Sequence, residues 1–399
     1  MSTELGAPNK MLRGRVLHVV GGLDHGGVEK WLLQAARGLH DHGYRSDVLV
    51  SSRTTGAYER DIVALGSSVI RAAPPTSVIP FLLDFRRVLR EHGPYNAVHS
   101  HVWLASGIVL LAAFVFGVPV RIAHSRTARD PFRGGIVRRG YAALMRCLMA
   151  RCATHLAGIS DEAGAMLFGR RRWTKHGMLI PTAIDCSEFE LTVDRHTVRN
   201  DLGLPLESCV IGHVGNLREP KNHRLLLRVF REILTEIPDA ALLLVGDGPL
   251  REELHALAGK LAIADRVYFV GPRSDVARLM LGAMDVFVFP SIWEGMGRAV
   301  VEAQAAGLPC VISDRIPNAA VVVDDLVERV PLSAPPHAWA TRIVETYRRE
   351  RMSRTTALRA VQASDMSMSS LVPTLVMLYD GTDCPSGSSL QPAHDSEYR

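Results

Sequence analysis

The chain has 399 residues, of which 47% are hydrophobic and 22% charged, and its formal net charge is +5. This length predicts two domains with separate cores, and the composition is that of a soluble enzyme. Its six cysteines form no Cys-x-x-Cys and show no pairing pattern, which favours a reducing cytosol over a disulfide scaffold. Residues 1–14 lack an apolar core, so we expect no signal peptide and a disordered segment at residues 1–10. Basic residues do not interleave with aromatic ones, which argues against nucleic acid as a partner.

The N-terminal half alternates short apolar runs with amphipathic stretches. Strands are expected at residues 16–20, 47–51, 68–71, 97–100, 120–124 and 155–159. After the first of these, Val28, Trp31, Leu32, Ala35 and Leu39 recur at helical spacing, and Gly43 follows as a stop. This rhythm predicts a parallel sheet that binds ligands at the carboxyl ends of its strands.

Residues 102–119 imitate a membrane span, because they form a stretch of eighteen residues without a charge. Ser106, Gly107, Gly117 and Pro119 interrupt it, and a strand is expected on each side. A buried helix of an α/β sheet is therefore the favoured interpretation over a bilayer crossing.

Two further features of this half could bind ligands. The glycine-rich loop at residues 21–27 lacks the G-x-G-x-x-G spacing of a dinucleotide site and the Lys-Ser/Thr of a P-loop, so alone it is a weak signal. His99, His101 and His124 each lie at or just past the end of an expected strand. A zinc site is conceivable, but without a cysteine or carboxylate partner three structural histidines are the favoured interpretation.

Residues 126–151 contain seven arginines and one acidic residue. One apolar face is expected there, formed by Val137, Tyr141, Leu144, Met145, Leu148, Met149 and Cys152. That face could pack on the sheet or lie on a membrane surface, where basic residues are attracted to anionic lipid. Both alternatives stay open.

The C-terminal half repeats the strand–helix rhythm, with strands expected at residues 210–214, 241–245, 266–270, 286–289 and 310–313. Its central stretch is residues 290–314, where a Gly-punctuated turn feeds a helix of roughly three turns that Gly307 ends. A strand, a glycine turn and a helix form an anion cradle, because the first helical N–H groups lack partners within the helix. Glu294 and Glu302 are eight residues apart, hence rotated by roughly 80° and displaced by about 12 Å on a helix. They could grip two ends of one elongated ligand rather than act as an acid/base pair.

These stretches together resemble glycosyltransferase family 4, most closely its exopolysaccharide-synthesis branch. The family signature sets E-x7-E in a Glu-Gly-x-Gly turn before Val-Glu-Ala-x-Ala-Ala-Gly-x-Pro, and residues 289–313 match it without a break. Residues 246–254 resemble its donor-domain turn, residues 180–185 its interdomain connector and residues 19–29 its N-terminal glycine loop. The resemblance implies an α/β protein of GT-B architecture, with two Rossmann-like domains facing each other across a cleft. The acceptor domain would span residues 11–185 plus a crossing helix near 368–380, and the donor domain residues 186–365, with a disordered tail at 381–399.

The resemblance also implies roles for single residues. His124 matches the family's active-site histidine near the donor sugar, and Glu294 would accept hydrogen bonds from sugar hydroxyls, so these two are the expected catalytic residues. His101 and Arg126 are expected on the acceptor side. The expected donor-binding residues are Gly26, Gly27, Arg218, Lys221, Arg273, Gly295, Met296, Gly297, Arg298, Ala299 and Glu302. Lys221 would hold the donor diphosphate and Glu302 the ribose.

One position departs from the family pattern. Asn216 stands where an arginine that holds the diphosphate is usual, and Arg218 is the nearest residue that could supply the charge.

The implied function is a retaining transfer of a hexose-type sugar from a nucleotide diphosphate sugar, by family frequency a UDP-sugar. The acceptor would be a glycan or a lipid-linked glycan in exopolysaccharide or cell-surface polysaccharide synthesis. No Asp-x-Asp occurs in the chain, so neither a metal nor another cofactor is expected. We expect a cytoplasmic enzyme, with the inner face of the membrane as an alternative location.

Three other interpretations remain. A non-catalytic nucleotide-sugar-binding relative would explain Asn216, and an epimerase of the same fold would act without an acceptor. An NAD oxidoreductase would need the dinucleotide fingerprint that the chain lacks.

Overall fold

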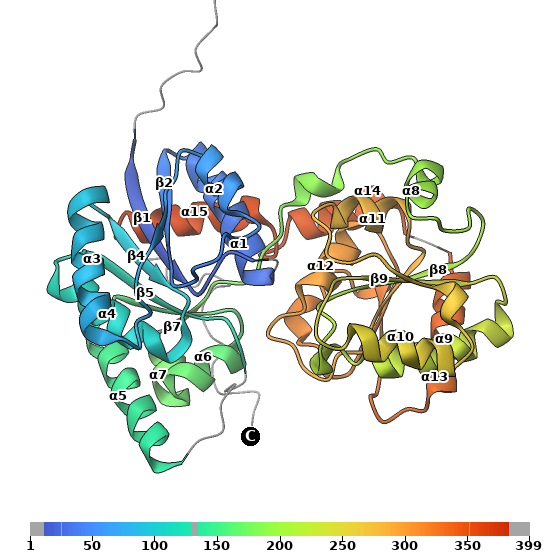
Figure 1. Ribbon diagram of the computed structural model, residues 1–399. Coiled ribbons are helices and arrows are strands. Elements are labelled where there is room, and N and C mark those ends of the chain that lie inside the picture. Colours follow the sequence, from blue (N-terminus) through green and yellow to red (C-terminus); the bar gives the residue numbers. More distant parts are fainter. Residues whose placement is uncertain (1–11, 25, 129–134, 351, 383–399) are drawn as a thin grey trace, which may run out of the picture. The chain divides into compact units, whose positions relative to one another are not determined.

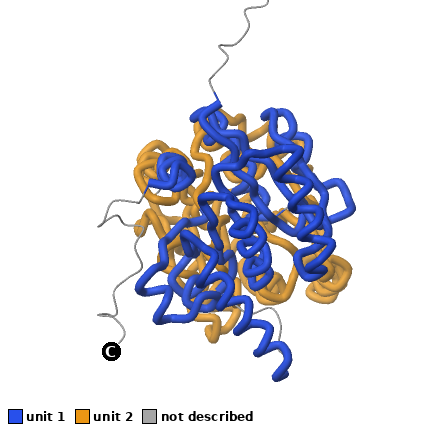
Figure 2. The backbone as a smooth tube through the Cα atoms, turned by 90° about the vertical axis from the view of Figure 1, so that its left-hand side faces the viewer, with its two compact units in different colours: residues 1–182, 371–399 blue, residues 183–370 orange. Residues whose placement is uncertain are grey.

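Two parallel β-sheets organise the protein, which is described here from a computed structural model covering residues 12–24, 26–128, 135–350 and 352–382 (Figure 1). Residues 1–182 and 371–399 form an N-terminal unit, and residues 183–370 form a C-terminal unit (Figure 2). The expected disordered ends lie outside the described residues, except for Gly381 and Thr382. These two form a turn in which the Thr382 hydroxyl donates to the Met377 carbonyl at 2.7 Å.

The N-terminal sheet has seven strands in the order β3-β2-β1-β4-β5-β6-β7. The strands are β1 (Gly14–Val20), β2 (Tyr44–Val50), β3 (Val69–Arg71), β4 (Ala97–Ser100), β5 (Val120–Ser125), β6 (His155–Gly158) and β7 (Gly177–Leu179). The helices that connect them are α1 (Gly27–Asp41), α2 (Glu59–Ala64), α3 (Val78–His92), α4 (Ser106–Val115), α5 (Ile136–Cys152), α6 (Asp161–Phe168) and α7 (Arg170–His176). Helices α3, α4 and α5 share one apolar core on one face of the sheet.

The C-terminal sheet has six strands in the order β10-β9-β8-β11-β12-β13. The strands are β8 (Val210–Val214), β9 (Ala241–Val245), β10 (Val267–Phe269), β11 (Val286–Phe289), β12 (Cys310–Ser313) and β13 (Val327–Val330). The helices are α8 (Arg195–Asp201), α9 (His223–Glu236), α10 (Arg251–Lys260), α11 (Val276–Gly282), α12 (Arg298–Ala305), α13 (Pro336–Arg348) and α14 (Arg354–Gln362). Helices α9, α10 and α13 share the core on one face, and α8, α11, α12 and α14 lie on the other (Figure 1).

The last helix, α15 (Met368–Tyr379), returns the chain to the N-terminal unit (Figures 1 and 2). Asp380, just after it, accepts hydrogen bonds from Arg13 and from the Tyr44 hydroxyl. A Cβ at Gly38 of α1 would lie 2.4 Å from Val372, so glycine lets α1 approach α15 closely. The C-terminal helix is therefore built into the packing of the N-terminal sheet.

Both sheets reverse their strand order at the first strand, between β1 and β4 and between β8 and β11. Ligands of open parallel sheets bind at such switch points, at the carboxyl ends of the strands. The expected pair of Rossmann-like domains is confirmed. Two edge strands, β7 and β13, are absent from the sequence-based prediction because each is short and largely half-buried, without the apolar run of a central strand.

The uncharged segment at residues 102–119 forms a short 3-10 turn and then α4, a ten-residue helix with seven buried residues. The favoured interpretation as a buried helix is confirmed. Across the described part of the chain, no helix combines the length and apolar character needed to cross a bilayer.

The expected apolar face of α5 is partly wrong. Met145, Met149 and Cys152 are buried, but Val137 is 89% exposed and Leu144 is 55% exposed. Helix α4 fixes this orientation, because a Cβ at Gly107 would lie 2.8 Å from the Met145 carbonyl oxygen. The close approach of the two helices buries the Met145 side of α5 and leaves other apolar residues on its outer side.

Candidate active site

Each unit has candidate site residues at the carboxyl ends of its strands, and we describe the two units separately. In the C-terminal unit the loops after β8, β9 and β10 are joined by main-chain hydrogen bonds. The Leu217 N–H donates to the Asp247 carbonyl at 3.0 Å, and the Gly246 N–H donates to the Gly271 carbonyl at 2.8 Å. Gly246 has a φ of 136°, and a Cβ there would lie 2.2 Å from the Gly215 carbonyl oxygen. Glycine is therefore required where the loops cross, which explains the sequence Gly-Asp-Gly at this turn.

Lys221, predicted to bind the donor diphosphate, and Glu294, predicted as a catalytic residue, meet in an ion pair. Lys221 Nζ lies 2.6 Å from Glu294 Oε1, and both side chains are mostly buried. Lys221 Nζ also lies 4.6 Å from the centre of the Phe289 ring. The loops that carry the pair are tied together, because the Ile292 N–H donates to the Pro220 carbonyl at 2.8 Å. This arrangement fixes a cation and an anion side by side at the carboxyl ends of β8 and β11.

Helix α12 begins at the expected glycine turn. Gly297 is its N-cap with a φ of 86°, and no side chain caps the first helical N–H groups. The helix has eight residues, fewer than the roughly three turns expected. Its predicted end is confirmed, because Gly307 adopts a φ of 72° and the Leu308 N–H donates to the Ala303 carbonyl at 2.9 Å. An uncapped helix N-terminus offers N–H donors and a partial positive charge to an anion.

Glu302 is paired with the first residue of its own helix. Arg298 Nε lies 3.1 Å from Glu302 Oε1, and Arg298 Nη1 donates to the Ala183 carbonyl at 2.9 Å. Both side chains are more than nine-tenths buried. The two glutamates of the E-x7-E motif therefore have different cationic partners, and the second pair is linked to the segment that enters the C-terminal unit.

The remaining expected donor-binding residues do not form one cluster of side chains. Arg273 forms a two-pronged ion pair with Asp275, with both contacts at 2.8 Å. Asn216 and Arg218 are exposed, and the Arg218 side chain makes no hydrogen bond or ion pair with another described residue. Gly295 and Ala299 are half-buried, whereas Met296 is 4% exposed and packs into the core.

In the N-terminal unit the expected histidines form a cluster together with residues that the sequence does not predict. His99 and His124 lie on neighbouring strands, with His99 Nε2 and His124 Nδ1 3.0 Å apart. His18 of β1 and Tyr379 of α15 complete the cluster, and Arg126 Nε donates to His101 Nδ1 at 3.1 Å. His18 could have been found, since it pairs in register with His99. Tyr379 could not, because it lies 280 residues from His99.

Burial keeps this cluster neutral. It lowers the pKa of His18 to about 3 and holds the pKa values of His99, His101 and His124 well below 6.5, with Arg126 adding to each shift. Trp31 lies edge-on to the rings of His99 and His124, and the Arg126 guanidinium lies 3.7 Å from the centre of the Trp31 ring. A buried indole and a half-buried arginine thus lie against the uncharged imidazoles.

The alternative of a zinc site can be tested against this geometry. The histidines that converge are His18, His99 and His101, whose nitrogens lie within 4.8 Å of one another, rather than the expected group with His124. Arg126 donates to His101 Nδ1, so the proton of neutral His101 is on Nε2, facing His18 Nδ1 at 3.3 Å. That proton occupies the place a metal would take, and the guanidinium adds an opposing charge. A hydrogen-bonded cluster fits these residues better than a cation site.

The glycine loop of the N-terminal unit leads directly into α1. Gly26 is the N-cap of α1, and a Cβ at Gly27 would meet no atom within 4 Å. There is space beside Gly27, but a Cβ at Gly26 would lie 2.2 Å from Glu29 Oε2, so the Glu29 carboxylate lies against the N-cap of α1. The donor-binding role of Gly26 and Gly27 stays a prediction. Glu29, in the first turn, has a pKa raised mainly by burial.

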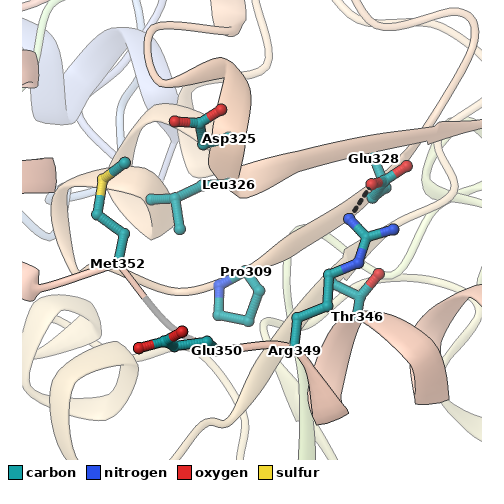
Figure 3. A pocket seen from close by; sticks show the side chains of 8 residues that line it. All are labelled: Pro309, Asp325, Leu326, Glu328, Thr346, Arg349, Glu350 and Met352. Atoms are coloured by element: carbon teal, nitrogen blue, oxygen red, sulfur yellow. Dashed lines mark hydrogen bonds and ion pairs between the residues drawn. The ribbon is translucent and has the colours of Figure 1, made fainter.

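A small cavity of about 40 Å³ lies elsewhere in the C-terminal unit (Figure 3). Pro309 precedes β12, and Asp325 and Leu326 precede β13, so the cavity is at the amino ends of these strands. None of the expected site residues lines it. The Lys221–Glu294 pair, by contrast, lies at the carboxyl ends of the strands of the same sheet.

Comparison with known proteins agrees with this architecture. The family model for glycosyl transferases group 1 matches residues 194–357, and that for the glycosyl transferase 4-like domain matches residues 26–175. Similar folds include Anabaena Alr3699/HepE, solved with UDP-glucose, with a TM-score of 0.73 at 19% identity over 92% of this chain and 100% of the other. The lipopolysaccharide glycosyltransferase WaaG gives a TM-score of 0.68 at 16% identity over 92% and 100% of the two chains. The fold is therefore GT-B.

Sequence relatives identify the family. The putative glycosyltransferase EpsF of Bacillus subtilis is 32% identical over 336 residues, covering 82% of this chain and 86% of the relative. The Escherichia coli UDP-Gal:alpha-D-GlcNAc-diphosphoundecaprenol alpha-1,3-galactosyltransferase is 30% identical over 240 residues, covering 58% and 61%. The chain belongs to the group 1, 4-like glycosyltransferase family, and it is a glycosyltransferase.

Proposed function

We propose that this glycosyltransferase moves a hexose-type sugar, with retention of anomeric configuration, from a UDP-sugar to a glycan or lipid-linked acceptor in cell-surface or exopolysaccharide synthesis. The observation that carries the donor assignment is the pairing of each E-x7-E glutamate with a cation beside an uncapped helix N-terminus. An E. coli relative whose name specifies UDP-Gal and a diphosphoundecaprenol-linked acceptor supports the choice of substrates.

The donor would be held by exchange of ion-pair partners. Lys221 is paired with Glu294 here, and a diphosphate beside it would take over part of that cation's interaction. Glu294 would then be released toward the sugar hydroxyls, while Glu302, held by Arg298, accepts from the ribose. The N–H groups at the start of α12 would add about 0.3–2 kcal/mol of stabilisation for an anionic group.

Sugar transfer would follow from departure of the nucleoside diphosphate. The bond between the anomeric carbon and the phosphate oxygen breaks, which leaves an oxocarbenium-like centre and a charged diphosphate. The acceptor hydroxyl oxygen bonds to the anomeric carbon on the face that the diphosphate leaves, and the hydroxyl proton passes to the departing phosphate oxygen. Fixed donors and cations at the position where that charge develops are the largest source of stabilisation in such a step. Lys221 and the α12 N-terminus would fill this role, and we propose that no metal is needed.

His124 would face the donor sugar from the end of β5. Its Nδ1 is taken by His99, and its Nε2 lies 3.1 Å from the Ile180 carbonyl. The Nε2–H group is the ring donor that could be redirected to a sugar hydroxyl. His101 and Arg126, which are hydrogen-bonded to each other, would lie on the acceptor side.

Contact with a membrane surface belongs to the same proposal, with the enzyme acting at the cytoplasmic face of the bilayer. Ile136 and Val137 are 86% and 89% exposed at the start of α5, next to Arg138 and Arg139. Exposed apolar side chains flanked by basic ones suit an anionic bilayer surface. Co-sedimentation with anionic but not with neutral vesicles, lost in Ile136→Asp/Val137→Asp, is the expected result; equal recovery with both vesicle types contradicts this part.

Thermal unfolding in the presence of UDP, GDP, ADP or NAD, with a chelator added, tests the donor assignment. A nucleotide at a hundred times its dissociation constant stabilises the folded state by about 2.7 kcal/mol. We expect a shift with UDP alone, followed by sugar transfer when an acceptor is supplied. No shift with any nucleotide favours the non-catalytic alternative, in which Asn216 has weakened the grip on the diphosphate. Isomerisation of the donor without an acceptor favours the epimerase.

A further inference from the structure

Three side chains from distant segments form a continuous hydrogen-bonded line inside the N-terminal unit. The Tyr379 hydroxyl lies 2.8 Å from His99 Nδ1, and His99 Nε2 lies 3.0 Å from His124 Nδ1. His124 Nε2 lies 3.1 Å from the Ile180 carbonyl. All three side chains are at most 1% exposed. We call this line the imidazole chain.

The position of every proton in the imidazole chain follows from its last member. A carbonyl oxygen only accepts hydrogen bonds, so His124 Nε2 carries a proton. Burial and the charge of Arg126 lower the pKa of His124, so its ring is neutral and Nδ1 has a lone pair. His99 must therefore donate from Nε2 and accept at Nδ1, where the Tyr379 hydroxyl is the donor.

Arg126, His101 and His18 form a second hydrogen-bonded line beside the imidazole chain, and it also fixes the proton of His101 on Nε2. Arg126 Nε can only donate, so His101 accepts at Nδ1 and donates from Nε2 to His18. The His101 ring stacks on His99 with centroids 4.3 Å apart. The ring stacked on His99 is thus neutral, and burial together with the charge of Arg126 disfavours a second proton on His99.

We propose that Tyr379 and His99 are positioning residues that keep the proton of His124 on Nε2. This proposal rests on the proposed function, in which His124 directs its Nε2–H at the donor sugar. Without the Tyr379 hydroxyl, His99 can place its proton on Nδ1, which turns its Nε2 into an acceptor. His99 Nε2 would then compete with the Ile180 carbonyl for the proton of His124. The fraction of His124 rings with the proton on Nδ1 would present a lone pair where the N–H group is required.

The chain supplies a matched control for this test. The Tyr44 hydroxyl donates to Asp380, one residue beyond Tyr379, and the two tyrosine rings lie 5.9 Å apart. Tyr44 belongs to β2, so Tyr44→Phe removes a hydrogen bond to the residue just after α15 without removing a member of the imidazole chain. A loss that reflects only weaker docking of α15 will therefore be shared by Tyr44→Phe and Tyr379→Phe.

The experiment measures histidine tautomers by nitrogen-15 NMR and transfer rates from a UDP-sugar for the wild type and both variants. We expect Nε2–H on His99 and His124 in the wild type and in Tyr44→Phe. In Tyr379→Phe we expect an Nδ1–H population on His99 and His124, and a kcat about ten-fold lower with an unchanged donor KM, as for the loss of one buried hydrogen bond. Tautomers and kcat that match Tyr44→Phe would overturn the proposal.

Variants of His99 keep the proposal testable if Tyr379→Phe does not fold. His99→Gln retains an N–H that can reach His124 Nδ1 and is expected to keep most of kcat, whereas His99→Leu is expected to lose about ten-fold. Equal kcat in the two variants would overturn the proposal. If the wild type transfers no sugar, the proposed function fails. The NMR measurement then still decides the tautomer assignment, which Nδ1–H on either histidine would overturn.

Discussion

The carboxyl ends of the two sheets differ in how their polar groups are satisfied. In the N-terminal unit, uncharged imidazoles are hydrogen-bonded to one another and buried. In the C-terminal unit, Lys221 and Arg298 are ion-paired with Glu294 and Glu302. A neutral network with protons in fixed places can orient a group, whereas ion pairs can exchange one anion for another. We therefore propose that the network of the N-terminal unit positions a reacting group and that the ion pairs of the C-terminal unit hold an anionic ligand.

Lowering the pH is expected to have the largest effect, because it should destabilise the N-terminal unit more than the C-terminal unit. Four histidines of the N-terminal cluster have lowered pKa values, against two in the C-terminal unit, His213 and His223, the latter at about 4. Because the unfolded chain binds these protons near pH 6.5, stability present above that pH is lost as the pH falls. Each of these histidines is expected to lower the free energy of unfolding by about 1.4 kcal/mol as the pH falls from 7.5 to 5.5.

Hydrogen exchange at pH 7.5 and 5.5, corrected for intrinsic rates, measures this loss by region. We expect β1, β4 and β5 to lose protection well before β8 and β11. The lowered pKa values of Asp47 and Asp285 act only at lower pH, so they do not disturb this window. Equal loss in both units would contradict the assignment of neutral, buried histidines.

Removal of the cation at the donor site is expected to have the next largest effect. Lys221→Ala leaves Glu294 without its partner and the diphosphate without its charge, so we expect kcat/KM to fall about 100-fold. Lys260→Ala, at the exposed end of α10, removes the same charge from the same unit and should leave kcat/KM unchanged. Steady-state rates over a range of donor concentrations separate the two, and a similar loss in both would point to net charge alone.

The Arg298–Glu302 pair should couple in nucleotide binding. Arg298→Gln and Glu302→Gln are each expected to weaken UDP binding by about ten-fold, and the double variant by little more than either, because the two groups act as one unit. Calorimetric titration of UDP into the wild type, the two single variants and the double variant completes this double-mutant cycle. Fully additive losses would mean that Arg298 does not act through Glu302.

The smallest effect concerns the departure from the family pattern. Asn216→Arg adds a charge at an exposed position of the loop after β8, and we expect UDP to bind about three-fold more tightly, in the range of a solvent-screened ion pair. Arg218→Ala should weaken binding to a similar degree if Arg218 supplies the missing charge. An unchanged affinity in Asn216→Arg would show that this position lies away from the diphosphate.

The sequence predicts best what local chemistry decides. The strands at residues 210–214, 241–245 and 310–313 coincide with β8, β9 and β12, because buried parallel strands are continuous apolar runs. The glycine turn before α12 is equally local, since Gly297 must adopt a positive φ. Strand β13 escapes prediction because Glu328 and Arg329 interrupt its apolar pattern at the edge of the sheet.

Partners set by tertiary structure could not be predicted. The sequence identifies Lys221 and Glu294 as site residues but not as partners, because 73 positions separate them. The same holds for Tyr379 and His99, which meet only because α15 returns to the first sheet. The exposed position of Val137 follows from the close packing of α4 on α5, which helical periodicity alone does not reveal.

Hydrogen exchange with and without UDP tests most directly the claim that the C-terminal unit holds the donor at the carboxyl ends of its strands. We expect added protection in residues 215–221, 246–251 and 290–302, with the imidazole chain of the N-terminal unit unaffected by UDP alone. Protection confined to the N-terminal unit, or to the cavity at the amino ends of β12 and β13, would contradict the account.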